Sequence, residues 1–280
     1  FEDAWRKKEL PQFFKATGVL IVAGLIGVSI NLSNLYHTYE YSKETMRGKS
    51  ELKYEGAAAK QTSSGLNRDY ITQWSYGIGE TFSLLVPNVK GGASVPLSRS
   101  EKAMEKANPM YSSLYSQLTQ YFGDQPMTSG PVYVGAFVLM LFILGCFIVK
   151  GPMKWALLGA TIFSILLSWG KNFMGLTDFF IDYIPMYNKF RAVSSILVIA
   201  EFTIPLLAIL TLKEILTKPE LLKEKLKYIY ISFGLTGGLA LLFAIAPRLF
   251  FPTYIPDNEM AALQNALPAD QLSPIIANLE

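Results

Sequence analysis

Three cations bracket a short connection between two apolar blocks, within the stretch GKNFMGLTDFFIDYIPMYNKFR: Lys171, Lys189 and Arg191. Clustered basic residues at a membrane face attract phosphates, and a guanidinium matches two phosphate oxygens in two-point contact. The cluster therefore indicates a site for an anionic headgroup. The alternative is that Asp178 and Asp182, one helical turn apart in the same stretch, neutralise these cations locally.

A second group of residues could bind a sugar. Asp69 and Glu80 flank the stretch YITQWSYGIG, in which Trp74 and Tyr76 could stack on a sugar ring while the glycines let the backbone come close. Carboxylates accept hydrogen bonds from sugar hydroxyls. This collection suits carbohydrate binding, and it equally suits the core of a small domain.

Glu201 lies within the apolar stretch VSSILVIAEFTIPLLAIL. An ionised carboxylate facing lipid would cost several kcal/mol, about 2.5–3.5 kcal/mol even on insertion scales. Glu201 must therefore face other helices, stay protonated or find a partner. Pro205, four residues later, predicts a kink at this level. Glu201 either ties two spans together or serves substrate passage or proton handling.

Motifs of soluble enzymes are absent from the sequence. There is no P-loop, G-x-S-x-G, H-E-x-x-H or complete dinucleotide fingerprint, so no cofactor is evident. His37 has no second histidine or cysteine nearby to complete a zinc site, so no metal site is expected. The net charge of +3 is small and no basic stripe carries interleaved aromatic residues, which argues against nucleic-acid binding.

These residues must be positioned by membrane-spanning helices. The 280-residue chain is 51% hydrophobic, and its apolar residues gather into blocks of about 17 to 25, the length that crosses a bilayer. The predicted fold is an all-α polytopic membrane protein with about five spans and one mixed extracytoplasmic domain between the first two. The predicted spans cover residues 13–35, 131–149, 153–169, 192–213 and 227–250.

The polar stretch between the first two spans gives mixed signals. Residues 71–94 combine β-branched, aromatic and glycine residues and are either strand or irregular. Asn108 and Pro109 resemble a helix start, and apolar residues recur at helical spacing from Tyr111 to Phe122. A surface helix is expected there.

Lysines and arginines beside the spans predict the orientation. They form three groups that fall on one side, taken as cytoplasmic: Arg6, Lys7, Lys8 and Lys15; Lys150 and Lys154; Lys213, Lys218, Lys223, Lys225 and Lys227. The predicted divisions are a cytoplasmic flank and first span at 1–35, an extracytoplasmic domain at 36–130, a four-helix region at 131–250 with an outer interfacial loop at 170–191, and an extracytoplasmic tail at 251–280. Arg47 and Glu40 would then reach the same outer interface as Lys189 and Arg191.

Several long stretches resemble the YfhO-like family of bacterial multispanning membrane proteins, in its Bacteroidetes form. They are NLYHTYEYSKETMRGKSEL, RDYITQWSYGIGETFSLLVPN, DQPMTSGPVYVGA, LSWGKNFMGLTDFFIDYIPMYNKFRAVS and VIAEFTIPLLAIL. The resemblance implies a multi-pass protein of the bacterial inner membrane, similar to GT-C-type glycosyltransferases that take a sugar from a polyprenyl-phosphate donor on the outer face. It implies membrane lipids as further partners.

By that resemblance Lys171, Lys189, Arg191 and Arg47 would contact the donor phosphate, and Asp69, Trp74, Tyr76 and Glu80 would lie nearer the acceptor. The chain begins with Phe1 and is expected to be a piece of a longer protein, whose main catalytic carboxylate lies outside this sequence. The alternatives are a membrane transporter or lipid flippase, favoured by Glu201 and Pro205, and a non-catalytic membrane scaffold.

Overall fold

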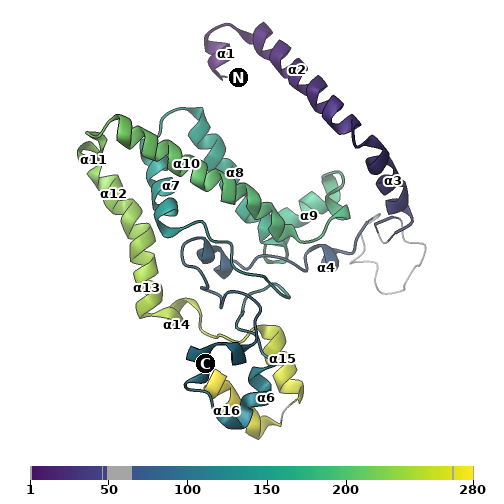
Figure 1. Ribbon diagram of the computed structural model, residues 1–280, viewed down its shortest axis with the longest axis vertical. Coiled ribbons are helices and arrows are strands. Elements are labelled where there is room, and N and C mark those ends of the chain that lie inside the picture. Colours follow the sequence, from purple (N-terminus) through teal and green to yellow (C-terminus); the bar gives the residue numbers. More distant parts are fainter. Residues whose placement is uncertain (1, 46, 49–64, 267, 280) are drawn as a thin grey trace. The chain divides into compact units, whose positions relative to one another are not determined.

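The computed structural model describes residues 2–45, 47–48, 65–266 and 268–279. All elements of regular structure in these residues are helical (Figure 1). The α-helices are α1 Glu2–Arg6, α2 Leu10–Ser29, α3 Leu32–Lys43, α4 Arg68–Ile71, α5 Glu101–Met104, α6 Ser112–Tyr115, α7 Ala136–Ile148, α8 Pro152–Ser168, α9 Met174–Tyr183, α10 Val198–Thr217, α11 Leu221–Glu224, α12 Leu226–Phe233, α13 Leu239–Ile245, α14 Pro247–Phe250, α15 Asp257–Ala266 and α16 Ala269–Leu279.

Short 3₁₀ segments connect several of these helices. They are η1 Gly79–Leu84, η2 Leu97–Arg99, η3 Pro109–Tyr111, η4 Gly170–Phe173, η5 Tyr187–Lys189 and η6 Val193–Leu197. A π-helical turn, Gly234–Gly238, joins α12 to α13 into one continuous helical run.

Three helical runs in the described residues are long and apolar enough to cross a membrane: Leu10–Ser29, Val193–Thr217 and Leu226–Ile245. A fourth crossing is possible if α8 and the bent segment after it count as one span. The chain is therefore a multi-pass membrane protein by the length and composition of its helices. The prediction of five spans is wrong by this criterion, because only three to four qualify.

The missing crossing is the predicted span at 131–149. Its helix, α7, has only 13 residues, about 20 Å at 1.5 Å per residue, against a hydrocarbon core of about 30 Å. Gly135 precedes α7 with a φ of 99°, a conformation that favours glycine, and Pro131 stands earlier in the same apolar stretch. Residues 131–135 are apolar yet not helical, so composition alone overestimated the helix.

The chain divides into two compact units. The larger unit holds residues 72–180 and 191–280. In this unit α10 packs against α7 and α8 (Figure 1). A Cβ atom at Gly145 in α7 would overlap the Thr211 hydroxyl of α10, so glycine allows this close approach. Between α8 and α10 the buried hydroxyls of Thr161 and Thr203 share a hydrogen bond of 2.7 Å.

The prediction of a mixed extracytoplasmic domain is wrong, because the described part of that domain contains no strand. Residues 65–135, here called the connecting segment, hold short helices, irregular backbone and one isolated β-bridge between Pro96 and Thr119. Gly91 and Gly92 have φ values of 85°, which interrupts extended pairing near the bridge. Residues 49–64 of the predicted domain lie outside the described residues.

The helix expected from Tyr111 to Phe122 is also much shorter than predicted. The Asn108 side chain does accept a hydrogen bond from the Met110 N–H at 3.0 Å, as expected of a helix start. However, only η3 and the four-residue α6 follow it. The apolar side chains at helical spacing are nevertheless buried. Tyr115 ends the short α6, and Leu118 and Tyr121 lie in non-helical backbone.

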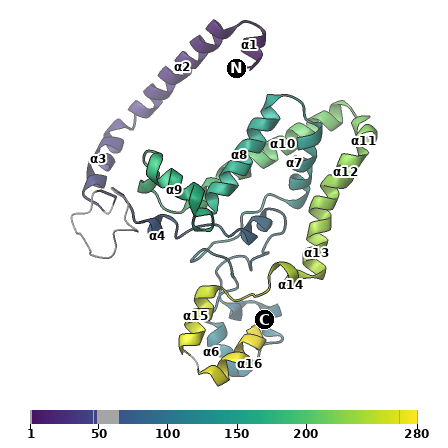
Figure 2. The ribbon, with the colours of Figure 1, turned by 180° about the vertical axis from the view of Figure 1, so that it is seen from behind.

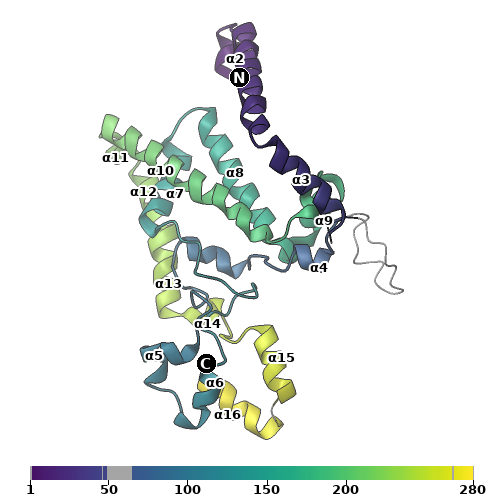
Figure 3. The same ribbon diagram turned by 45° about the vertical axis from the view of Figure 1, so that its right-hand side comes forward.

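The C-terminal helices α15 and α16 lie beside α6 in the same unit (Figure 3). Asn278 Oδ1 accepts hydrogen bonds from the Tyr115 hydroxyl and from the Asn108 N–H, the latter at 3.3 Å. The Thr119 hydroxyl donates to Glu259 Oε1 at 3.3 Å. The segment predicted as a tail is thus a helical pair joined to the connecting segment.

The smaller unit holds residues 1–71 and 181–190, and its main elements are α2 and α3 (Figure 2). Neither helix contains a buried residue. The chain segments 65–66 and 188 meet in this unit, where the Leu66 N–H donates to the Asn188 carbonyl at 2.9 Å.

A sharp bend separates α8 from the helical segment that follows it. The axis of Gly170–Tyr183 turns by 109° from that of α8. Gly170 occupies the bend with a φ of 45°, and its carbonyl accepts a hydrogen bond from the buried Thr177 hydroxyl at 2.9 Å. A Cβ atom at Gly170 would overlap Ser75 Oγ and lie 2.6 Å from a methyl carbon of Val193.

We predict that Gly170→Ala lowers the free energy of unfolding by about 2–4 kcal/mol, because both the positive φ and the missing space oppose a side chain. The matched control is Gly175→Ala in α9, where nothing lies within 4 Å of an added Cβ. Thermal melting in detergent measures both. Equal melting temperatures for the two variants would show that the bend tolerates a side chain.

Candidate functional site

A groove of about 700 Å³ opens beside Trp74 in the larger unit. The other side chains that line it are hydroxyl, amide and apolar ones: Ser94, Thr119, Gln125, Pro126, Met127, Thr128 and Ser129. Its volume lies within the roughly 300–1,000 Å³ typical of small-molecule sites. None of these eight lining residues carries a charge, so the groove suits a neutral, hydroxyl-rich group.

The two sides of the groove are both tied to the segment after Arg191. The Ser194 N–H donates to the Trp74 carbonyl at 3.1 Å, and the Ser194 hydroxyl donates to the Gln125 side chain at 3.3 Å. The Arg191 guanidinium carbon lies 5.1 Å from the centre of the Trp74 ring, within the range of cation–π attraction. A cation therefore stands at the aromatic end of the groove.

A buried carboxylate holds the wall that carries Gln125. Glu80 is 3% exposed, and its Oε2 accepts hydrogen bonds from the N–H groups of Gly77 at 2.6 Å and Asp124 at 3.3 Å. Its Oε1 accepts a hydrogen bond from the Tyr121 hydroxyl, which in turn accepts one from the Gln125 N–H at 2.9 Å. Glu80 thus fixes residues 121–125 and does not line the groove.

Tyr76 belongs to the same buried region. It is 2% exposed, and its hydroxyl shares a hydrogen bond with Ser83 Oγ, which also donates to the Val132 carbonyl at 3.1 Å. A cavity of about 10 Å³, the space for one water molecule, lies between Tyr76, Glu80 and Tyr121. Tyr76 and Glu80 are thus both buried and do not line the Trp74 groove.

Burial changes the acidity of both buried phenols. Loss of hydration raises the pKa of Tyr76 above its ordinary value. Loss of hydration also raises the pKa of Tyr121, and the negative charge of Glu80 adds to the effect. Both phenols therefore keep their protons well into the alkaline range.

The groove wall is joined to the bend after α8. The Asn172 amide donates to Asp124 Oδ2 at 2.7 Å and to the Tyr76 carbonyl at 3.0 Å, while Lys171 Nζ donates to the Asp124 carbonyl at 3.0 Å. Sequence reasoning missed Asp124 and Gln125. Both lie in the stretch DQPMTSGPVYVGA, whose acidic and amide side chains are the signal that points to them.

Among the predicted phosphate ligands, the structure brings Arg47 and Lys189 together in the smaller unit. Arg47 Nε donates to the Lys189 carbonyl at 2.9 Å, and Lys189 Nζ donates to the Arg47 carbonyl at 2.5 Å. Lys171 and Arg191 belong to the larger unit. Each pair is thus a separate candidate for anion contact.

Two further residues that the sequence analysis considered, Asp182 and Asp69, have local partners in the smaller unit. Asp182 forms an ion pair of 2.6 Å with Arg68, a cation that the sequence analysis had not considered. Asp69, a predicted acceptor ligand, is exposed at the start of α4, where its N–H donates to the Asn67 side chain at 2.9 Å. Asp69 belongs to the smaller unit and Trp74 to the larger one.

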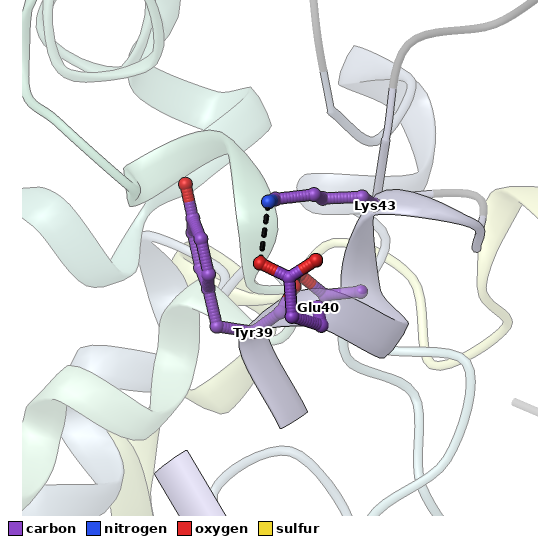
Figure 4. A network of polar contacts seen from close by, with 4 residues as sticks. Tyr39, Glu40 and Lys43 are labelled. Atoms are coloured by element: carbon purple, nitrogen blue, oxygen red, sulfur yellow. Dashed lines mark hydrogen bonds and ion pairs between the residues drawn. The ribbon is translucent and has the colours of Figure 1, made fainter. Parts of the chain in front are cut away.

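Helix α3 carries an exposed polar contact of its own. Lys43 Nζ lies 2.6 Å from Glu40 Oε1 and 4.6 Å from the centre of the Tyr39 ring (Figure 4). The hydrogen bond to Glu40 raises the pKa of Lys43. His37 packs edge-on against Tyr36 at 5.7 Å, and no cluster of three or more metal-ligating side chains occurs among the described residues.

Glu201 lies in the first turn of α10 and is exposed at the surface of the chain. In the described part of the protein its carboxylate takes part in no hydrogen bond or ion pair. The exposed position of Glu201 differs from the expected burial against other helices, and its role stays a prediction.

No family model, no curated protein and no solved structure matches this chain. The family resemblance of the quoted stretches therefore stays a prediction. The properties of the site rest on the geometry described above.

We predict that Tyr121→Phe lowers the free energy of unfolding by about 2–4 kcal/mol, because it removes a donor to a buried carboxylate and leaves the Gln125 N–H without its acceptor. The control is Tyr133→Phe, since the Tyr133 hydroxyl accepts from the Ala136 N–H on exposed backbone that water can solvate. Denaturant titration in detergent compares the two. A Tyr121→Phe variant as stable as the control would contradict the role of the carboxylate network.

Alkaline pH should destabilise the protein because the pKa values of Tyr76 and Tyr121 are raised in the folded state. Unfolded tyrosine ionises near pH 10, whereas the folded pKa of both Tyr76 and Tyr121 is raised. Above pH 10 the folded state therefore binds more protons than the unfolded state. The contribution of the two phenols to the free energy of unfolding is complete below pH 10 and falls above it, by up to about 1.4 kcal/mol per pH unit for each phenol. Unfolding titrations between pH 9 and pH 12 should give a shallower fall for Tyr76→Phe than for the unmodified protein. Identical slopes would contradict this assignment.

Proposed function

We propose that this chain is part of a bacterial inner-membrane protein that binds a polyprenyl-phosphate-linked sugar, with the sugar in the Trp74 groove, as part of a glycosyltransferase-like activity. The observation that carries the proposal is the groove itself. It combines one indole ring with the side chains of two serines, two threonines and one glutamine. Lysine-rich flanks on the opposite side would place the groove outside the cytoplasm.

The chemistry of the lining supports a sugar as the ligand. A sugar ring presents C–H groups on its faces and hydroxyls around its edge. The indole of Trp74 offers an apolar face, and hydroxyl and amide side chains can both donate and accept hydrogen bonds. A site of neutral hydrogen-bonding groups with one aromatic platform matches that pattern better than it matches an apolar or a highly charged ligand.

The nearby cations support a phosphate in the same ligand. Arg191 stands against Trp74 at 5.1 Å, and Lys171 is held beside Asp124, which directly precedes Gln125 of the groove. A phosphate attached to the sugar would gain from both positive charges. The second basic pair, Arg47 and Lys189, remains a further candidate for donor contact.

The stretches that carry the family resemblance include most of the groove lining. Six of the eight lining residues fall within two of the stretches that carry it, namely Trp74 and residues 125–129. The catalytic carboxylate would lie outside this chain, as the resemblance implies. Glu80 is unsuitable for that role because its oxygens are buried and already accept three hydrogen bonds.

A lipid flippase is the second candidate, and Glu201 is the observation that favours it. A carboxylate exposed on a membrane-spanning helix costs free energy unless it is protonated or covered, and such residues often mark transport paths. Glu201 also precedes Pro205 in α10. Proline removes one backbone hydrogen bond from α10 near this acid, which favours bending of the helix at this level.

We predict that Trp74→Ala weakens donor binding more than about tenfold, equivalent to about 1.4 kcal/mol, because the aromatic platform is lost. The control is Trp155→Ala, an exposed tryptophan at the start of α8 and remote from the groove lining. Filter binding of radiolabelled polyprenyl-phosphate sugars to the protein in nanodiscs measures both variants. Equal affinities would remove the groove as the sugar site.

The same labelled donor separates the two candidate functions in the full-length protein. In liposomes, transfer of the label to an added acceptor supports a glycosyltransferase. Movement of intact donor between leaflets without transfer supports a flippase. Binding without either outcome would support the scaffold alternative.

A further inference from the structure

The helical segment after the bend, α9, has three distinct strips along its length. Thr177 and Ile181, one turn apart, are both buried. Phe179 and Tyr183, one turn apart, are 51% and 72% exposed. Because successive residues are rotated by about 100°, Asp178 and Asp182 form a third strip beside these aromatic residues.

The position of α9 follows from α8. Lys154 lies at the start of α8, and the helix then runs for 17 residues, about 25 Å, before it ends at Ser168. That length brings the chain near the opposite boundary of a hydrocarbon core of about 30 Å. A turn of 109° at this point leaves α9 about 19° from the membrane plane if α8 follows the membrane normal.

The apolar surface is continuous around the bend. Phe163, on the exposed surface of α8, contacts the Phe180 ring of α9 with 5.6 Å between ring centres. Ile162 on α8 is also largely exposed. The exposed apolar surface of α8 therefore continues onto α9 through this aromatic contact, which favours lipid over a partner protein as its cover.

We propose that α9 lies in the headgroup layer as an in-plane membrane anchor, with Phe179 and Tyr183 toward the hydrocarbon and Asp178 and Asp182 toward water. An amphipathic helix in this position buries its apolar face to roughly 5–10 Å. Aromatic side chains favour this layer because one end of the ring system tolerates polar surroundings. The inference does not depend on sugar binding.

The anchor also fixes the height of the groove above the bilayer. The Lys171 N–H donates to Ser75 Oγ at 2.8 Å, and the Tyr76 N–H donates to the Ser168 carbonyl at 2.8 Å. Both bonds join the bend to the residues next to Trp74. The groove is therefore held at the membrane surface, where a ligand carried by a lipid would meet it.

Spin labels on the aromatic strip and on the acidic strip test the proposal. Single cysteines are placed at Phe179, Tyr183, Asp178 and Asp182 in a Cys146→Ser background, and the protein is studied in phosphatidylcholine nanodiscs. Oxygen, which concentrates in hydrocarbon, and a water-soluble nickel chelate report the depth of each label. Ile209, exposed in the middle of α10, is the lipid reference, and Ser116 in the connecting segment is the aqueous one.

The expected result is a several-fold higher ratio of oxygen to nickel accessibility at Phe179 and Tyr183 than at Asp178 and Asp182, with similar depths for the two aromatic positions. Nickel accessibility at all four positions, like that of Ser116, would overturn the proposal. So would a depth equal to that of Ile209 at all four, which indicates insertion across the membrane. Accessibility to neither reagent at the aromatic positions would indicate a protein cover and would also overturn it.

A label that disturbs folding does not weaken the test, because each strip has two members. Any variant that fails to give a single gel-filtration peak is replaced by its strip partner. If both aromatic positions fail, Leu176, on the lipid-facing side of the same helix, takes their place.

Discussion

The Glu80 carboxylate is the constraint on which the candidate site depends. Burying a charge costs several kcal/mol unless hydrogen-bond donors replace its water. Here the donors are two backbone N–H groups and the Tyr121 hydroxyl. Two glycines make room for them, because a Cβ at Gly123 would overlap both Glu80 and Tyr121, and one at Gly77 would lie 3.0 Å from a Glu80 oxygen. These hydrogen bonds hold residues 121–125, which form one wall of the groove.

The same region joins the connecting segment to helices α7, α8 and α10. Tyr76 and Leu84 belong to one apolar core with Phe142 of α7, Leu157 of α8 and Ile204 of α10. The site is therefore not a separate domain attached by linkers. Its buried side chains pack against the helical bundle. Hydrogen bonds from Lys171 and Asn172, next to the Gly170 bend, attach residues 75 and 76 a second time.

Composition predicted the class of fold because apolar blocks long enough to cross a bilayer leave few alternatives. It failed where backbone conformation matters more than hydrophobicity. The stretch 131–135 is apolar yet not helical, since Gly135 needs a positive φ. The β-branched and aromatic residues after Ile71 left strand and irregular backbone equally open, and the structure has turns and a 3₁₀ helix there.

The site was predictable only in part. Trp74 was identified because an indole beside glycines is an informative local pattern. Tyr76 and Glu80 stand in the same pattern but point inward, and sequence spacing cannot separate the two outcomes in irregular backbone. Thr119 and Gln125 could not be found, because the groove joins segments that only tertiary packing brings together. Arg47 and Lys189 contact each other within the smaller unit, whereas Arg191 belongs to the larger one.

The contact between Arg47 and Lys189 has a consequence for how the protein is made. Each side chain donates to the other's backbone carbonyl, and the two residues are 142 positions apart. A ribosome synthesises Arg47 long before Lys189, so the contact cannot form until α7 and α8 have been synthesised. Until then α2, the candidate span that precedes Arg47, must stay in the membrane without this contact. The 20-residue apolar α2 satisfies its own backbone hydrogen bonds, so it can occupy the membrane before that contact forms.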